Sequence, residues 1–532
     1  MVQKKDNPDA GLRSLNHYKT RLPRWRHALR ERLLPIVRFE TPYVAWLQNS
    51  LRSPFLDSYF AMTANLGTHT FFMVMLPIIF WCGYNNVGRG MVYILAAGVY
   101  WSGFAKDLMC LPRPLSPPLQ RITMSGSVAL EYGFPSTHSA NAVSVAIYCI
   151  HLLRTGETAG TTLNSTLQGL AYFYFFSIAI GRLYCGMHGF FDVTWGTVLG
   201  SIIAFLQCKY GDAFDLYLYE GDIQRLIIAV LVVCVLVRIH PEPVDDCPCY
   251  DDSVSFAGVV VGIFFGSWHY AHSGWALNDP TPATVRFDLE KMGWGITILR
   301  ITLGVVIIFV WRAGAKPTLL RILPPIFRSI EHYGLTLPRR YFTPASQYKT
   351  VPAQRNDDNV IPSARDIPGL LRRRRAVSIG PQSEADAYEA LAYRAKQRRD
   401  SMHLSPVEAS PPASPKAGYF TDSPLDNGES VRGNRKRASS LELFKAQMGM
   451  GAESLSPVAV DSPGRSRAGA GSPDEDADDE VLQTSTLFAN VQKPRVRYDV
   501  EVVTKLIVYC GIGWLAVEWN PVIFEKVGLG LN

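Results

Sequence analysis

The chain reads KDLMCLPRP at residues 106–114, PSTH at residues 135–138 and RLYCGMHGFFD at residues 182–192. Each of these polar clusters stands at the end of a strongly apolar segment, and apolar segments recur from residue 59 to residue 311. In a bilayer such segments form helices, because no water is present to satisfy open backbone groups. The stretch therefore predicts membrane helices whose polar ends meet on one face.

The first two clusters contain the residue types that bind an anion. Lys106 and Arg113 lie seven positions apart, about two helical turns, so the two cations can converge on one anion. Ser136 and Thr137 precede an apolar run, where the free backbone N–H groups of a helix start favour anions. Ordinary N-capping is the alternative role for Ser136.

The third cluster adds a further cation and a pair suited to nucleophilic catalysis. His188 and Asp192 lie four positions apart and would share one helix face. A carboxylate in that position can hold an imidazole in one tautomer. Arg182 supplies the third cation; the alternative role for all three cations is interfacial snorkelling.

Taken in order, Lys-x6-Arg-Pro, Pro-Ser-x-His and Arg-x5-His-x3-Asp resemble the signature of the type 2 phosphatidic acid phosphatase (PAP2) superfamily. The sequence of residues 110–118 and 131–138 most resembles the branch of this superfamily that comprises the sphingosine-1-phosphate and long-chain-base-1-phosphate phosphatases, in particular the fungal ones. The resemblance covers roughly residues 54–312. Thr137 agrees with that branch, whereas Gly181 stands where many superfamily members have Ser.

Hydrolysis of a phosphate monoester calls for charge neutralisation, a positioned nucleophile and a proton for the leaving oxygen. His188 would be the nucleophile, as the matching histidine is in the family, and Asp192 would stabilise its imidazolium. His138 would protonate the departing alkoxide and then activate water. No metal or other cofactor is expected, since the cations supply the charge that a metal would. The phosphate-binding residues would be Lys106, Arg113, Ser136, Thr137 and Arg182.

The expected fold is all-α: a polytopic membrane helical bundle of about 8–9 spans with the PAP2 helical core, plus a long disordered polar region. Residues 1–56 would be a basic arm with an interfacial helix near Tyr43–Phe55, and residues 57–312 the phosphatase domain, with its catalytic core at 100–208. Residues 313–498 would be disordered, and residues 499–532 would contain a last transmembrane segment. The candidate spans are Tyr59–Trp81, Met91–Ala105, Ser139–Leu153, Leu170–Tyr184, Phe190–Cys208, Leu226–Ile239, Phe256–Tyr270, Trp294–Trp311 and Val503–Val517.

Charges outside the clusters fit a membrane protein. The formal net charge of +7 comes largely from the N-terminal arm and from basic patches such as residues 372–375. Membrane topology explains these charges better than a nucleic-acid partner does. Arg300 falls inside an apolar segment, so it needs a protein or water partner, in either a functional or a structural role.

The nine cysteines do not indicate a disulfide framework, because most lie in or beside apolar segments, where cysteine acts as a small hydrophobe. Cys247 and Cys249 could form a bridge or a metal ligand pair, with an ordinary loop as the main alternative. In the polar region, Ser-Pro pairs and the run at 435–439 resemble kinase sites. Kinases are therefore candidate partners, and an unmodified tail is the alternative.

The resemblance implies a sphingoid long-chain-base 1-phosphate substrate taken from the bilayer, and a multi-pass protein of the endoplasmic reticulum membrane with its site facing the lumen. Positive-inside bias, counted over the predicted spans, favours a cytosolic site instead. Asn164 begins a glycosylation sequon opposite the catalytic face, and a sugar there would also make that face cytosolic. The alternatives are a superfamily phosphatase for another lipid or isoprenoid phosphate, and a non-catalytic lipid-phosphate binder or transporter.

Overall fold

The chain is mainly helical, as the sequence predicts. In the part of the chain that the structure describes there are two strands, each of three residues. The computed structural model describes residues 17–63, 69–116, 118–123, 131–156, 160–245, 247–278, 281–334, 341–351, 377–379, 387–394 and 496–531.

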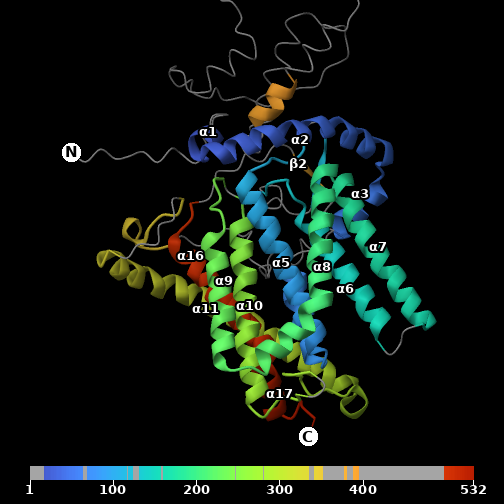
Figure 1. Ribbon diagram of the computed structural model, residues 1–532, viewed down its shortest axis with the longest axis vertical. Coiled ribbons are helices and arrows are strands. Elements are labelled where there is room, and N and C mark those ends of the chain that lie inside the picture. The colour runs from blue at the N-terminus through green and yellow to red at the C-terminus, as the bar shows by residue number, and fades with distance from the viewer. Residues whose placement is uncertain are drawn as a thin grey trace, which may run out of the picture.

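The long helices run side by side along one axis of the molecule and alternate in direction (Figure 1). Short connections such as residues 82–84 and 220–222 allow consecutive helices to pack as antiparallel neighbours, whereas the longer connection of residues 110–136 joins α5 to α6. The bounds are α4 His69–Trp81, α5 Asn85–Met109, α6 Thr137–Thr155, α7 Thr162–Tyr184, α8 Phe190–Tyr219, α9 Ile223–Ile239, α10 Cys249–His272, α11 Leu289–His332 and α16 Asp499–Trp514. The last of these continues through the π-helical turn η5 Leu515–Trp519 into α17 Asn520–Lys526.

Close backbone approach holds α10 against α16. A Cβ atom added to Gly262 would lie 2.0 Å from Cys510 O, so only glycine permits this approach. Nearby, the fully buried Trp81 donates from Nε1 to Ala516 O at 3.0 Å, which ties α4 to the same contact. The C-terminal helix is therefore an integral part of the bundle core.

Three helices lie across one end of the bundle (Figure 1): α1 His17–Arg21, α2 Arg24–Leu51 and α3 Pro54–Thr63. On α2 the aromatic side chains of Trp25, Phe39, Tyr43 and Trp46 are exposed, while its opposite side is buried against the bundle. Such a helix is suited to the boundary between headgroups and acyl chains. A helix does cover most of the predicted segment, but it begins well before Tyr43 and ends at Leu51, and its interfacial position stays a prediction.

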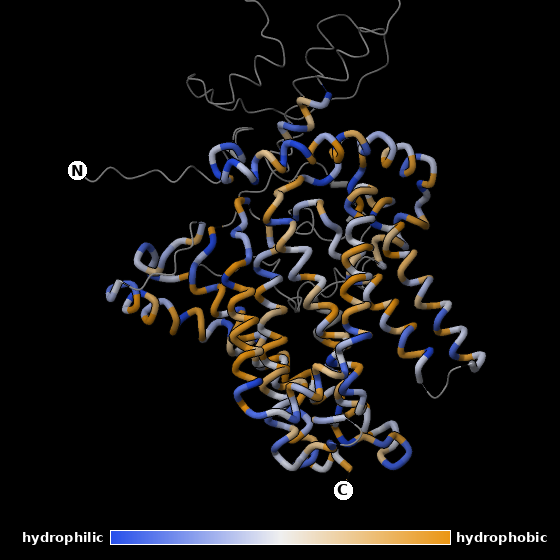
Figure 2. Tube along the Cα trace, viewed as in Figure 1, coloured by the Kyte–Doolittle hydropathy of each residue, from blue (hydrophilic) through white to orange (hydrophobic). Residues whose placement is uncertain are grey.

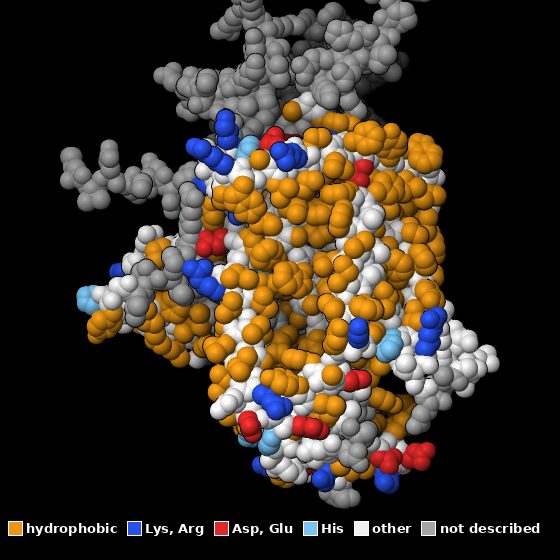
Figure 3. Space-filling model, viewed as in Figure 1, with side chains coloured by type: hydrophobic (Ala, Val, Ile, Leu, Met, Phe, Trp, Pro, Cys, Tyr) orange, Lys and Arg blue, Asp and Glu red, His pale blue; other side chains and the backbone are white. Residues whose placement is uncertain are grey.

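An apolar belt surrounds the middle of the bundle. Figure 2 shows hydrophobic residues along the central turns of the helices and hydrophilic ones toward the ends. In Figure 3 basic side chains gather near α1 and α2, and charges of both signs gather at the opposite end of the face shown. Between these two ends the side chains are mainly hydrophobic (orange). Among the residues that the structure describes, four helices are long and apolar enough to cross a membrane by length and composition: Phe190–Tyr219, Cys249–His272, Leu289–His332 and Asp499–Lys526.

The structure does not confirm the predicted count of 8–9 spans. The predicted span Tyr59–Trp81 is divided between α3 and α4, with residues 64–68 outside the described part. The helix α11 continues past residue 312, where the phosphatase domain was expected to end. Most of residues 313–498 lie outside the described residues, so disorder and kinase sites there stay predictions.

Three parts of that region do contact the rest of the chain. The strand β2 Val377–Ile379 pairs antiparallel with β1 Arg121–Thr123, with Ile122 opposite Ser378. In the helical segment 387–394, Glu389 accepts a hydrogen bond from Arg30 of α2 at 3.1 Å. A short turn, η3 Ala345–Gln347, also packs beside α11.

Arg300 has a structural role. Its guanidinium is buried, donates to Arg286 O at 3.3 Å and to Leu529 O at 3.4 Å, and lies 4.9 Å from the centre of the Phe524 ring. It thus joins α11 to the C-terminal segment at the end of the bundle opposite α2. Of the two roles that the sequence left open, pairing within the structure is the one observed.

Candidate active site

The three sequence clusters meet at the end of the bundle that α2 covers. Lys106 lies in the last turn of α5, Ser136 is the N-cap of α6, and Asp192 lies in the first turn of α8. The backbone N–H of Ser136 donates to Asp192 O at 3.0 Å and so joins the starts of α6 and α8. Residues far apart in sequence are thereby placed around one point.

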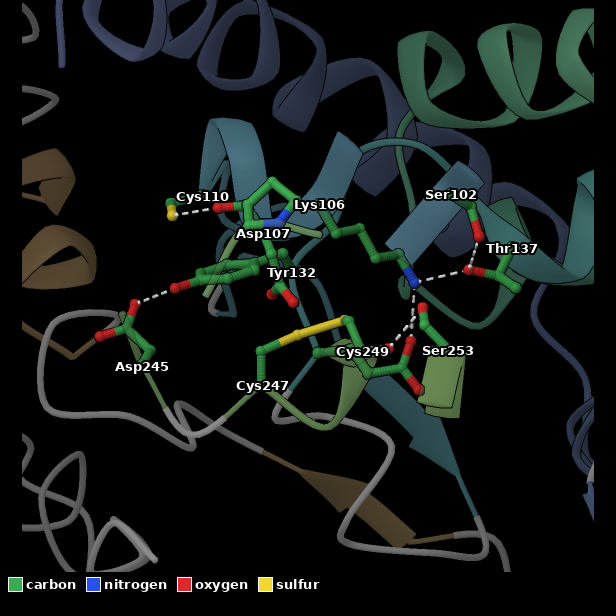
Figure 4. Close-up of a disulfide and its surroundings, with 12 residues drawn as sticks. Ser102, Lys106, Asp107, Cys110, Tyr132, Thr137, Asp245, Cys247, Cys249 and Ser253 are labelled. Carbon is green, nitrogen blue, oxygen red and sulfur yellow. Dashed lines mark hydrogen bonds and ion pairs between the residues drawn. A yellow bond between two sulfur atoms is a disulfide. The ribbon is translucent and has the colours of Figure 1, made fainter. Parts of the chain in front are cut away.

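Lys106 connects the first cluster to the second. Its Nζ atom donates to Thr137 Oγ1 at 2.8 Å and to Glu131 Oε2 at 2.8 Å. Figure 4 shows the Lys106 side chain reaching toward Thr137, whose hydroxyl lies 2.8 Å from Ser102 Oγ. The Thr137 hydroxyl therefore contacts one of the three cations, and its role in phosphate binding stays a prediction.

Arg113 holds the three clusters together. Its Nε donates to Glu131 O at 2.9 Å, and its Nη1 donates to Met187 O at 2.7 Å. The same Nη1 lies 3.2 Å from His188 Nε2. A guanidinium fork makes such contacts from separate nitrogens in a fixed plane, whereas an ammonium group donates from a single nitrogen.

The tautomer of His188 follows from its partners. Because Arg113 can only donate, His188 Nε2 must accept, so this nitrogen carries no proton. The proton then lies on Nδ1, which is 3.5 Å from Asp192 Oδ2. Asp192 is itself oriented by the Gly189 N–H, which donates to Oδ2 at 3.0 Å. The unprotonated Nε2 therefore points at the cations, as a nucleophile in a phosphate site must.

Arg182 and His138 complete the group. Arg182 is 3% exposed, and its Nε has no hydrogen-bond partner among the described residues. A buried guanidinium nitrogen without a partner is costly, and an anion held between it and Arg113 would satisfy it. His138 follows Thr137 in the first turn of α6, is partly exposed, and interacts electrostatically with Arg182 and Lys106.

The charges in the loops shift the titration of their neighbours. Burial and the nearby cations Arg113 and Lys106 hold the pKa of His188 well below 6.5, so the imidazole is neutral at physiological pH. Burial lowers the pKa of Arg113 to about 10, where it remains protonated. Burial alone would raise the pKa of Glu131, but Lys106 and Arg113 outweigh it and lower that pKa to about 2. The site thus combines an ionised carboxylate, several cations and a neutral histidine.

Side chains of α2 hold the loops in place. Gln48 donates from Nε2 to Gln120 O at 2.7 Å and to Tyr184 O at 2.8 Å, joining the loop before β1 to the end of α7. Arg38 donates to Arg113 O at 3.2 Å. Glu40 accepts from Phe191 N at 2.9 Å, next to the start of α8. None of these residues was predicted to support the site, because their partners lie far away in the sequence.

The structure explains three features left open by the sequence. Ser136 Oγ accepts from Ser139 N at 3.3 Å, so the N-capping role is present and a role in phosphate binding stays a prediction. A Cβ atom on Gly181 would lie 2.8 Å from the Phe60 ring, which explains why this position has no side chain. Asn164 is 2% exposed and its side-chain amide donates to Leu153 O, so the sequon is not presented as a sugar acceptor.

Cys247 and Cys249 are joined by a disulfide in the loop before α10, on the same end of the bundle as Lys106 (Figure 4). Of the alternatives that the sequence allowed, the bridge is therefore the one found, and the ordinary-loop interpretation was wrong. Among the described residues, the pair and Asp107 also form one group of metal-type ligand atoms within 4.8 Å of one another. The sulfurs are bonded to each other, however, and a metal is bound by thiolates.

This arrangement can bind a phosphate group and attack it. Three cations surround a neutral imidazole whose free nitrogen faces them, and a second histidine lies at the edge of the same group. A residue that sequence reasoning missed is Glu131, whose carboxylate lies among the cations. Its position within the EYGFPSTH run, directly before the second cluster, was the available signal.

Comparisons with known proteins agree with this geometry. A model of the PAP2 superfamily matches residues 88–213, the part of the chain that contains all the clusters. Dihydrosphingosine 1-phosphate phosphatase C823.11 of Schizosaccharomyces pombe is 40% identical over 341 residues, which are 62% of this chain and 81% of that relative. Dihydrosphingosine 1-phosphate phosphatase YSR3 of Saccharomyces cerevisiae is 33% identical over 304 residues, 57% of this chain and 73% of the relative.

More distant relatives include Lipid phosphate phosphatase delta of Arabidopsis thaliana, 30% identical over 215 residues, which are 40% of this chain and 51% of the relative. No solved structure matches the chain. The two fungal relatives are similar over most of their own length, and the family model covers the helices that carry the site. The chain belongs to the PAP2 superfamily.

Proposed function

We propose that this chain is a membrane phosphatase of sphingolipid metabolism, which hydrolyses sphingoid long-chain-base 1-phosphates to the free base and inorganic phosphate. The names of the two fungal relatives support this substrate class. The observation that carries the chemistry is the position of His188, with Nε2 3.2 Å from Arg113 Nη1 and Nδ1 3.5 Å from Asp192 Oδ2. A nucleophilic imidazole needs one unprotonated nitrogen that faces the anion site and an orienting partner for the other nitrogen, and the bound phosphate would take the place of His188 as the partner of Arg113 Nη1.

In the first step the phosphate dianion binds to Lys106, Arg113 and Arg182. His188 Nε2 attacks phosphorus, the bond from phosphorus to the lipid oxygen breaks, and that oxygen takes a proton from His138. A phosphohistidine forms, and the positive charge that develops on the ring is stabilised by the Asp192 carboxylate.

In the second step His138, now unprotonated, removes a proton from water. The water oxygen attacks phosphorus, the phosphorus–nitrogen bond breaks, and inorganic phosphate is released with His188 restored to its neutral form. The same histidine thus acts first as acid and then as base, and both steps require it at the edge of the phosphate site, where it is partly exposed.

The chain's own cations supply the charge stabilisation in both steps, so we propose that no metal ion takes part. Three permanent cations converge on one dianion, and guanidinium groups bind phosphate oxygens in pairs. Measuring activity in excess chelator tests this proposal directly, because loss with EDTA and recovery with Mg²⁺ would contradict it.

We further propose that the nine helices α4 to α11 and α16 all cross the membrane of the endoplasmic reticulum, with the site on the lumenal face. Alternating direction and the apolar belt support the crossing helices (Figures 1 and 3). The Cys247–Cys249 disulfide lies at the catalytic end, and disulfides persist in oxidising compartments such as this lumen. Protease protection of an epitope tag at the N-terminus in sealed microsomes would support the lumenal face, and cleavage would contradict it.

The deciding experiment measures phosphate release by the purified full-length protein in detergent and EDTA. Dihydrosphingosine 1-phosphate, phosphatidic acid and an isoprenoid diphosphate are compared, for the wild type and for His188→Ala. We expect a preference for the first substrate that is lost in the variant, and an acid-labile, base-stable phosphoenzyme that only the wild type forms.

Other outcomes separate the alternatives. Phosphate release from another lipid would support the phosphatase mechanism but change the proposed substrate class. Turnover by a correctly folded His188→Ala variant would overturn the proposed phosphohistidine intermediate. Binding of all three lipids without release from any of them would identify a lipid-phosphate binder or transporter.

A further inference from the structure

Glu131 occupies the site that the mechanism assigns to phosphate, yet the mechanism does not use it. Its Oε2 accepts from Lys106 Nζ at 2.8 Å and lies 3.5 Å from Arg113 Nη2. Its backbone oxygen accepts from Arg113 Nε at 2.9 Å, which fixes the residue beside the guanidinium. The side chain is 15% exposed, so this contact is made largely out of water.

A carboxylate among cations that bind phosphate would compete with the substrate, so its presence there requires an explanation. A phosphate dianion that binds to Lys106 and Arg113 must displace the Glu131 carboxylate from at least one of them. Both anions would then lie against the same cations and repel each other in a medium of low dielectric constant. The carboxylate is tolerated only if another cation enters the site together with the phosphate.

Sphingoid bases carry such a cation. They are 2-amino alcohols, so the carbon that bears the ammonium group is bonded to the carbon that bears the phosphate ester oxygen. That oxygen is the leaving group, and the mechanism places it at His138. The Glu131 carboxylate interacts electrostatically with His138 as well as with Lys106 and Arg113, so it lies near the histidine that the mechanism assigns to the leaving oxygen.

We propose that Glu131 binds the ammonium group of the substrate and selects aminated lipid phosphates over phosphates that lack an amine. The inference rests on the proposed function, and it identifies the ammonium group as the feature of the substrate that the site recognises. On binding, the phosphate takes over Lys106 and Arg113, and the ammonium takes their place as the partner of the carboxylate. A phosphate without the amine leaves the carboxylate unpaired beside a dianion.

The test compares two substrates that share a chain and a phosphate: dihydrosphingosine 1-phosphate and its N-acetyl derivative, in which the amine is an uncharged amide. We expect the wild type to favour the free amine by about tenfold to a hundredfold in kcat/KM, the usual contribution of a charged hydrogen bond. In Glu131→Gln this ratio should fall to about one, mainly through a higher KM for the free amine, and Glu131→Asp should keep part of it.

Inhibition by inorganic phosphate gives a second readout. Removing the competing carboxylate should make Glu131→Gln bind free phosphate more tightly than the wild type does, whereas an unfolded site would bind it less. The matched control is Glu220→Gln, the same chemical change at an exposed position at the far end of α8, which should leave both readouts unchanged.

Each result has a clear meaning. If Glu131→Gln lowers kcat/KM for both substrates equally, or weakens phosphate inhibition, Glu131 is only an internal counter-ion and the proposal fails. If the wild type hydrolyses both substrates equally well, the proposal fails while the phosphatase function stands. If the wild type hydrolyses neither, the proposed function itself is wrong, and this inference is overturned with it.

Discussion

Replacing Arg113 with lysine keeps the charge of the phosphate site but removes the geometry that joins its parts. Arg113 donates from Nε to Glu131 O, and its Nη1 both donates to Met187 O and contacts His188 Nε2, so two nitrogens of one rigid fork make the three contacts. A single ammonium group can replace at most part of this set. Losing two hydrogen bonds to a charged group costs about 3–6 kcal/mol.

If this loss falls on the transition state, Arg113→Lys lowers kcat/KM by about 10²- to 10⁴-fold, since each 1.36 kcal/mol is tenfold. Phosphate release from dihydrosphingosine 1-phosphate in mixed micelles measures it, and the thermal midpoint in the same detergent reports any loss of fold. Arg225→Lys, at an exposed arginine that donates to Tyr217 O at the other end of the bundle, is the matched control. A folded Arg113→Lys enzyme within about threefold of the wild type would refute the reasoning, since a charge alone would then suffice.

Asp192→Asn should lower kcat by about 10³- to 10⁴-fold with little change in KM, because an amide cannot stabilise the imidazolium; near-normal turnover would remove Asp192 from the mechanism. Excess EDTA should leave phosphate release unchanged, as assayed before and after metal is restored. Gly262→Ala should cost about 1–3 kcal/mol or more of stability by pressing against Cys510 O, while Gly295→Ala, in open space, should not; equal thermal midpoints would contradict the close packing of α10 and α16. The ion pairs lower the pKa of Glu131 to about 2, so they confer stability that is complete above about pH 4.5 and is lost as pH falls. Between about pH 6 and about pH 3, Glu131→Gln should therefore lose less thermal stability than the wild type. An equal loss in the two proteins would count against the ion pairs.

The sequence predicted the parts of the site that depend on local spacing. Lys106, Ser136 and Asp192 each lie at a helix end, and a helix end is set by nearby prolines, glycines and caps, which the sequence displays. Once the helices alternate in direction, their polar ends must meet. The resemblance to a known superfamily supplied the expected roles, and the structure gives His188 the tautomer that the proposed nucleophile would need.

What the sequence could not show are contacts made across long distances. The glutamine at position 48 joins segments that lie 72 and 136 residues away, and nothing in its own neighbourhood indicates this. Glu131 was missed for a different reason: a carboxylate is unexpected among phosphate-binding cations, so its charge seemed irrelevant until the distances were known. The bond between Cys247 and Cys249 depends on the path of a loop, which spacing alone does not determine.

The position of α2 has a consequence for how the protein is studied. Its exposed aromatic face is shaped to sit among lipid headgroups, while its other face carries Gln48, Arg38 and Glu40, which hold the catalytic loops. At the interfacial position predicted for it, the depth of this helix would depend on the thickness and lateral pressure of the surrounding bilayer, which a detergent micelle does not reproduce. Rate constants of this enzyme are therefore properties of protein and lipid together, and membranes of different composition should set different turnover on the same chain.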